Sequence, residues 1–149
     1  MSEGYSRLIG IPLAVWERDG LIASLAKAGL LAEDVTTPGP LFWRFENEAM
    51  PVGFGGLELY GDQALLRSVV TLPPMRKRGI GRGIVAALEV EARIRACRAL
   101  WLLTPGADFF AHLGYRRCER ADMPKVLQET EQAAKLCPAS AIAMTKRLD

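Results

Sequence analysis

The most constraining feature of this sequence is a stretch in which an apolar strand, a basic turn and a long helix follow one another. Residues 64–72 have the pattern of a strand, and Pro73 and Pro74 end it because proline cannot donate a hydrogen bond to a sheet ladder. A helix with apolar residues at helical spacing begins at Ile80. The local positive charges are Arg76, Lys77, Arg78 and Arg82. This order predicts a mixed α/β (α+β) domain in which helices pack on a central sheet.

The turn has the composition of an anion-binding loop. The first backbone N–H groups of a helix have no partner within it, and the helix dipole adds partial positive charge at the same end. Gly79 and Gly81 would let the backbone approach a phosphate closely. Basic side chains oppose the dipole here, a conflict that is expected where a ligand supplies negative charge. A solvated basic turn without a ligand is the alternative. The loop matches neither the dinucleotide fingerprint nor a Walker loop.

The periodicity of apolar residues predicts the remaining elements. Gly61-Asp62 is a two-residue hairpin turn, since glycine tolerates positive φ. The predicted helices span residues 12–32, 80–96, 107–113 and 124–136, and the predicted strands span 41–46, 51–60, 64–72, 98–103, a segment that begins at Tyr115, and 140–148. A length of 149 residues fits one domain, 1–149. The side chains expected in the core include Tyr115, Trp16, Trp43 and Trp101.

Composition narrows the class of function. A net charge of +2 is too weak for a typical nucleic-acid-binding protein. No run reaches the about 18 apolar residues of a membrane span, and the N-terminus lacks the basic and apolar regions of a secretory signal. Three widely spaced cysteines form neither a disulfide framework nor a zinc site, and a single histidine excludes a histidine-rich metal site. We therefore expect a cytoplasmic protein with no metal, membrane or nucleic-acid partner.

Two motifs resemble those of the GCN5-related N-acetyltransferase (GNAT) family. Arg76-x-x-Gly79-x-Gly81 is similar to the pyrophosphate loop of the family, and Phe109-Phe110-Ala111-His112-Leu113-Gly114-Tyr115 is similar to its second signature. The resemblance covers roughly residues 52–148, and within the family the chain looks most like the branch found in bacterial arsenic-resistance operons. It implies a mostly antiparallel central sheet with two splayed parallel strands and helices on both faces, and acetyl-coenzyme A (acetyl-CoA) as co-substrate.

The resemblance also implies roles for individual residues. The backbone N–H of Val69 would stabilise the oxyanion of the tetrahedral intermediate, and Thr71 would pair with the pantetheine amides. The alternative for both is ordinary core strand, and the two readings are compatible because the roles use main chain. The implied cofactor-binding residues are Val69, Val70, Thr71, Arg76, Lys77, Arg78, Gly79, Ile80, Gly81, Arg82, Phe109 and Phe110.

At two positions the sequence departs from the family. Phe110 stands where many members have the tyrosine that protonates the leaving thiolate, and Leu65 stands where many have a glutamate base. The general acid and base are therefore not assigned, and Tyr60, Ser140 and Glu58 are the weak candidates.

Other polar residues have competing interpretations. Glu58 and Arg67 share one face of the predicted hairpin, as a cross-strand ion pair or as contacts for the acceptor. Strand alternation places Ser68 on the face opposite Arg67 unless a bulge intervenes. His112 is expected to be a surface residue, and Cys137 has no basic neighbour in sequence that would make it a nucleophile.

The function implied is acetyl-CoA-dependent N-acetylation of a small amine by direct transfer in a ternary complex. The branch suggests a toxic amino-acid analogue, whose carboxylate Arg67 could meet, and the family suggests a homodimer. Two alternatives stay open. The departures at Phe110 and Leu65 allow a non-catalytic acyl-CoA-binding module, and a protein acetyltransferase would need an open groove for a peptide.

Overall fold

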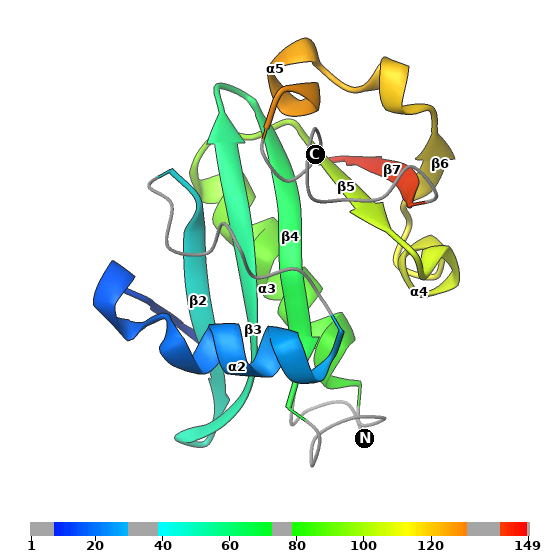
Figure 1. Ribbon diagram of the computed structural model, residues 1–149. Helices are drawn as coiled ribbons and strands as arrows, with labels where there is room; N and C mark the ends of the chain where they lie inside the picture. Colours follow the sequence, from blue (N-terminus) through cyan, green and yellow to red (C-terminus); the bar gives the residue numbers. More distant parts are fainter. Residues whose placement is uncertain (1–7, 30–38, 73–78, 131–140, 149) are drawn as a thin grey trace.

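The computed structural model describes residues 8–29, 39–72, 79–130 and 141–148, and within these ranges seven strands form one sheet (Figure 1). The strands are β1 (Ile9–Pro12), β2 (Leu41–Asn47), β3 (Met50–Tyr60), β4 (Gln63–Thr71), β5 (Ala99–Thr104), β6 (Arg116–Cys118) and β7 (Ile142–Arg147). The helices are α2 (Asp19–Lys27), α3 (Ile80–Ile94), α4 (Ala107–Ala111) and α5 (Lys125–Gln128), with 3₁₀ turns η1 (Val15–Glu17) and η3 (Arg120–Asp122).

The sheet order is β1-β2-β3-β4-β5-β7-β6. Every neighbouring pair is antiparallel except β4 and β5, which are parallel. The crossover between these two strands is α3, as parallel neighbours require. The predicted fold class, a mostly antiparallel sheet with one parallel pair in its centre, is confirmed.

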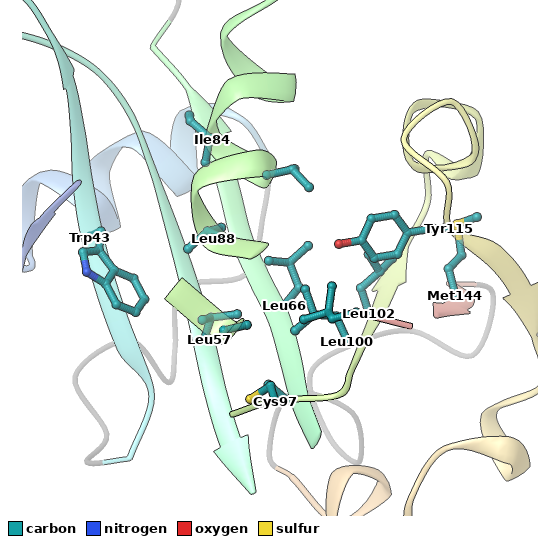
Figure 2. Packing of buried hydrophobic residues seen from close by; sticks show 14 of the residues in the cluster. Trp43, Leu57, Leu66, Ile84, Leu88, Cys97, Leu100, Leu102, Tyr115 and Met144 are labelled. Carbon is teal, nitrogen blue, oxygen red and sulfur yellow. The ribbon is translucent and has the colours of Figure 1, made fainter. Parts of the chain in front are cut away.

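Helices cover both faces of the sheet. Figure 1 shows α2 in front of β3 and β4 and α3 behind them. Strand alternation divides the apolar side chains between the two faces. On β2, Phe42 packs in the cluster with α2, whereas Trp43 and Phe45 pack in the larger cluster with α3, much of which is drawn in Figure 2. The predicted arrangement of helices on both faces is therefore confirmed.

Helix α3 forms because its apolar residues repeat at helical spacing. Ile80, Ile84, Leu88 and Ala92 lie on one stripe and are all buried. Each large member of such a stripe contributes about 1.5–3 kcal/mol when it is fully buried. Gly79, with φ of 74°, begins the helix in a left-handed conformation that glycine adopts readily. This residue fixes the direction in which the chain leaves the preceding loop.

Two helix boundaries and one strand differ from the sequence-based expectation at the N-terminal end. The predicted helix over 12–32 begins only at Asp19, and its described part ends at Lys27 before Gly29. Residues 9–12 instead form β1, which pairs with β2. This strand was missed because four residues that include Gly10 and Pro12 are too short a strand signal, and pairing with β2 determines their conformation.

The C-terminal helix is also shorter than predicted. Helix α5 ends at Gln128 and the chain turns at Glu129, where the prediction continued the helix to 136. Residues 131–136 of that prediction lie outside the described ranges, as does the start of the predicted strand at 140. A four-residue helix lacks the two turns that sequence periodicity needs for a boundary.

Of the aromatic residues expected in the core, Trp16 was predicted wrongly. Its side chain is 84% exposed on η1, because the segment expected to be helix is a 3₁₀ turn with no buried residue. Trp43 and Tyr115 are buried, and Trp101 is partly buried. None of the helices in the described ranges has the length and apolarity to cross a membrane.

Candidate active site

The two parallel strands at the centre of the sheet diverge. Three residue pairs join them, from Gln63 opposite Ala99 to Leu65 opposite Trp101. Beyond this point β4 continues to Thr71 without pairing with β5 over the part of the chain that the structure describes. A side-chain hydrogen bond also connects the two strands at this paired end, where Trp101 Nε1 donates to Gln63 Oε1 at 2.7 Å. The second half of β4 therefore turns an unpaired edge toward β5.

A bulge changes the phase of β4 within this unpaired half. Arg67 is opposite Gly56 and Val70 is opposite Phe54, so Ser68 and Val69 share one partner position. Ser68 has φ of 58°, a left-handed conformation that is uncommon for a residue other than glycine. The bulge predicted as the condition for Ser68 and Arg67 to share a face is present, and Arg67 Nε donates to Ser68 Oγ at 3.3 Å.

Strand alternation places two of the residues assigned to the cofactor on opposite faces of the sheet. Val69 packs with the core cluster under α3, whereas Val70 packs with α2 on the other face. Thr71 ends the strand beside the start of α3, because a Cβ built on Gly81 would lie 3.6 Å from Thr71 Oγ1. The end of β4 and the first turn of α3 therefore adjoin each other.

The second predicted motif, residues 109–115, also lies beside the first turn of α3. A Cβ on Gly81 would lie 3.2 Å from Phe109 Cζ, so the ring of Phe109 covers this glycine. Phe109 is 42% exposed, and Phe110 is partly buried and packs edge-on against it with ring centroids 4.9 Å apart. The structure thus brings together Thr71, Gly81 and Phe109, which are distant in sequence.

The rest of the basic loop is only partly described. Gly79 and Arg82 are exposed, and Ile80 is anchored in the core. Arg76, Lys77 and Arg78 lie outside the described residues, as do the candidates Cys137 and Ser140.

A polar cluster occupies the α2 face of β3 and β4. Arg67 Nη1 lies 2.7 Å from Glu58 Oε1, and the two side chains are 1% and 9% exposed. This confirms the predicted cross-strand ion pair. Tyr60 donates its hydroxyl to Glu58 Oε2 at 3.0 Å. Burial, and then the hydrogen bond to Glu58, raise the pKa of Tyr60. The raised pKa makes the Tyr60 hydroxyl a weaker acid than that of a free tyrosine.

Arg18 joins this cluster, and the sequence analysis did not identify it. It lies at the start of α2, is 5% exposed, and donates from Nη2 to the carbonyl oxygen of Pro40 at 3.3 Å. Its guanidinium lies 4.9 Å from the ring centroid of Phe42, and that of Arg67 lies 5.2 Å from the same ring. Burial and the nearby charge of Arg67 lower the pKa of Arg18. No local pattern could reveal it, because an arginine at a helix start ordinarily faces solvent.

The positions of the missing acid and base are apolar in their surroundings as well. Leu65 is 1% exposed in a cluster with Met123, Leu127 and Ala143.

His112 is exposed, as expected, with Nδ1 2.7 Å from the carbonyl oxygen of Asp108. Over the described ranges, no three His, Cys, Asp or Glu side chains are arranged to hold a metal ion.

These features define a class of protein. Its central parallel strands diverge beside a glycine-containing helix start, and the ring of Phe109 covers Gly81 there. A family model described as an acetyltransferase (GNAT) domain matches residues 38–117. The chain therefore belongs to the GNAT acetyltransferase family.

Individual proteins are similar to parts of the chain. An N-acetyltransferase of Chlorobaculum tepidum is 30% identical over 86 residues, which is 57% of this chain and 56% of that protein. N-alpha-acetyltransferase 80 of Mus musculus is 45% identical over 69 residues, 44% of this chain and 22% of that protein. The chain thus spans about half or less of the length of these relatives.

Solved structures share the fold over most of the chain. A GNAT-family acetyltransferase from Staphylococcus aureus superimposes with a TM-score of 0.70 at 17% identity, covering 95% of this chain and 99% of that one. Rv2747 from Mycobacterium tuberculosis, in complex with coenzyme A, does so with a TM-score of 0.69 at 20% identity, covering 93% and 99%. At these identities the likeness concerns the fold.

Proposed function

We propose that the protein transfers the acetyl group of acetyl-CoA to the amine of a small molecule. One observation carries the proposal: β4 and β5 diverge where β4 ends beside Gly81 and Phe109. An elongated cofactor with a diphosphate needs such a site, with unpaired main chain for its amide arm and a helix start for its phosphates. Coenzyme A is also the bound molecule named for Rv2747, which shares the fold.

The transfer follows from the groups along β4. The acceptor nitrogen attacks the acetyl carbonyl, the N–C bond forms, and the C–S bond breaks with release of the coenzyme A thiolate. In the proposal the backbone N–H of Val69 donates to the carbonyl oxygen as it becomes an oxyanion. The proton lost by the amine balances the proton gained by the thiolate. In the proposal, most of the rate enhancement comes from the orientation of the two substrates and from an uncharged acceptor amine.

In the proposal, residues other than Phe110 and Leu65 carry out proton transfer, since these two side chains have no exchangeable proton. Tyr60 is the candidate donor because it carries a phenolic proton, which it donates to Glu58 in the structure. Glu58 accepts hydrogen bonds from both Tyr60 and Arg67, so its proposed role is to orient them. Ser140, the remaining candidate, lies outside the described residues.

The acceptor side of the proposal is an amine that also carries a carboxylate. Arg67 and Arg18 converge on the ring of Phe42, and a planar guanidinium suits bidentate carboxylate binding. The resemblance to the arsenic-resistance branch supports a toxic amino-acid analogue. A cytoplasmic location, which rests on the composition, and a homodimer, which rests on the resemblance, are further parts of the proposal.

Two other functions have specific support. Phe110 and Leu65, in place of the usual acid and base, favour a non-catalytic acyl-CoA-binding module. The identity of 45% to N-alpha-acetyltransferase 80 over 69 residues favours acetylation of a polypeptide.

Release of free thiol from acetyl-CoA tests the three functions. The assay compares amino acids and their analogues, amines without a carboxylate, and short peptides. We expect an amino-acid amine to accelerate release, and Gly81→Glu to abolish it by placing a carboxylate beside Phe109 at the phosphate end. Circular dichroism establishes that the variant is folded. Coenzyme A binding without acceleration by any amine would favour the binding module, and acceleration by peptides alone would favour the polypeptide enzyme.

A further inference from the structure

A buried polar network lies on the α3 face, away from the groups discussed so far. Tyr115 donates its hydroxyl to Glu89 Oε2 at 2.9 Å. Lys146 Nζ lies 3.1 Å from each carboxylate oxygen of Glu89 and donates to the carbonyl oxygen of Leu113 at 2.8 Å. Glu89 is 7% exposed and Tyr115 is 3% exposed. The network therefore joins α3, β7 and the turn that follows α4.

The turn after α4 packs against Lys146, and its conformation depends on Gly114. Gly114 has φ of 94°, which a residue with a side chain rarely adopts. A Cβ at this position would also lie 3.4 Å from Lys146 Cε. The backbone N–H of Tyr115 returns to the carbonyl oxygen of Phe110 at 3.1 Å. The glycine and the aromatic residue of the second motif thus place α4 relative to Lys146.

Aromatic contacts continue from the network to the helix start. The ring of Tyr115 lies edge-on to Phe110, with centroids 5.6 Å apart, and Phe110 lies edge-on to Phe109 at 4.9 Å. Phe109 covers Gly81, where a Cβ would lie 3.2 Å from Cζ. A continuous chain of contacts therefore runs from Glu89, in the middle of α3, through α4 and back to the first turn of α3.

We propose that Glu89, Tyr115 and Lys146 are positioning residues for coenzyme A binding, which hold Phe109 and Phe110 against the start of α3. The inference rests on the proposed function, because it concerns the cofactor end of the same site. The ion pair of Glu89 with Lys146, whose side chain is 26% exposed, adds little net stability, since desolvation and screening offset its attraction. Its hydrogen bonds have fixed directions, however, and so set the orientation of the ring that supports Phe110.

Calorimetric titration of coenzyme A into matched variants tests the inference. Tyr115→Phe removes the hydroxyl and keeps the ring, and Glu89→Gln removes the charge at nearly constant volume. We expect each to raise the Kd about tenfold, the effect of losing one charge-assisted hydrogen bond that holds a binding group. Tyr115→Leu, which also removes the ring contact to Phe110, should raise it further.

Two controls separate positioning from a general loss of stability. Glu91→Gln lies on the same helix and breaks the partly exposed pair of Glu91 with Arg95, 2.6 Å apart. Phe45→Leu makes a cavity at β2, and three strands of the sheet separate β2 from β7, which contacts α4. We expect Glu91→Gln to leave the Kd unchanged, and Phe45→Leu to lower the Tm and leave the Kd unchanged. Once an acceptor is known, the network variants should raise the KM for acetyl-CoA more than they lower kcat.

The results distinguish failure of this inference from failure of the proposed function. Absence of coenzyme A binding by the unaltered protein would contradict the proposed function. Binding by the unaltered protein together with an unchanged Kd for both Tyr115→Phe and Glu89→Gln would overturn the positioning role alone, as would an equal rise in the Kd for Phe45→Leu.

Discussion

Two glycines on β3 permit the close approach of the neighbouring backbone and of α3, and they predict unequal effects of the same substitution. A Cβ on Gly53 would overlap the carbonyl oxygen of Val70, which the sheet holds in place. A Cβ on Gly55 would meet the end of the Leu88 side chain at 2.6 Å, which can rotate away. We expect Gly53→Ala to lower the free energy of unfolding by about 3 kcal/mol and Gly55→Ala by about 1 kcal/mol. Urea denaturation measures both, and equal losses would contradict the structure.

Burial raises the pKa of four groups, Tyr60, Tyr115, Cys97 and Cys118. Above their ordinary values of 9.0 for cysteine and 10.0 for tyrosine, the folded chain keeps protons that the unfolded chain releases. The stability linked to these four protons is therefore fully present below pH 9 and is lost as the pH rises further.

Tyr115→Phe provides the matched measurement of this alkaline loss. The variant removes one of the four groups, so its stability should fall less steeply, by up to about 1.4 kcal/mol per pH unit above pH 10. Urea midpoints between pH 8 and pH 11 measure the slope for both proteins. Parallel slopes would show that the Tyr115 hydroxyl titrates alike in the folded and unfolded chains.

At the scale of the elements, β4 shows what periodicity can and cannot predict. Its apolar residues indicated a strand over 64–72, close to the observed Gln63–Thr71. No sequence pattern indicated the bulge at Ser68, because serine is not a residue that usually takes positive φ. The sequence analysis could only state the bulge as a condition. Pairing with β3 opposite Gly55 determines it.

The bulge predicts unequal effects of two substitutions at Ser68. Ser68→Gly should change the free energy of unfolding by less than about 0.5 kcal/mol, because relief of the left-handed strain offsets the lost hydrogen bond. Ser68→Val should lower it by about 2 kcal/mol, since a β-branched residue is disfavoured at φ of 58°. Thermal unfolding compares the two variants. Equal tolerance of valine and glycine would contradict a bulge at this residue.

The helices differ in how well the sequence predicted them. Helix α3 has a four-residue apolar stripe and a glycine before its first turn, and both signals are local. Helix α2 is shorter than predicted, since β1 and η1 form where tertiary pairing outweighs the local pattern. The short helices α4 and α5 have too few turns for periodicity to place their ends.

At the scale of the whole molecule, the sequence predicted local motifs better than contacts between distant elements. The two motifs each occupy a few consecutive residues, and the structure brings Gly81 and Phe109 together. Glu58 and Arg67 could be paired because hairpin register is regular. Arg18 and the network of Glu89 with Lys146 join elements far apart in the chain, so no local pattern indicates them.

Thermal unfolding with and without acetyl-CoA tests the central claim most directly. At about 100 times its Kd, a ligand that binds only the folded state adds about 2.7 kcal/mol, which raises the Tm by several degrees. The account predicts this rise for the unaltered protein and its loss in Gly81→Glu, whose side chain would stand between the start of α3 and Phe109. An unchanged Tm for the unaltered protein at saturating acetyl-CoA would contradict the account, and the basic segment at residues 76–82 would then be a solvated turn.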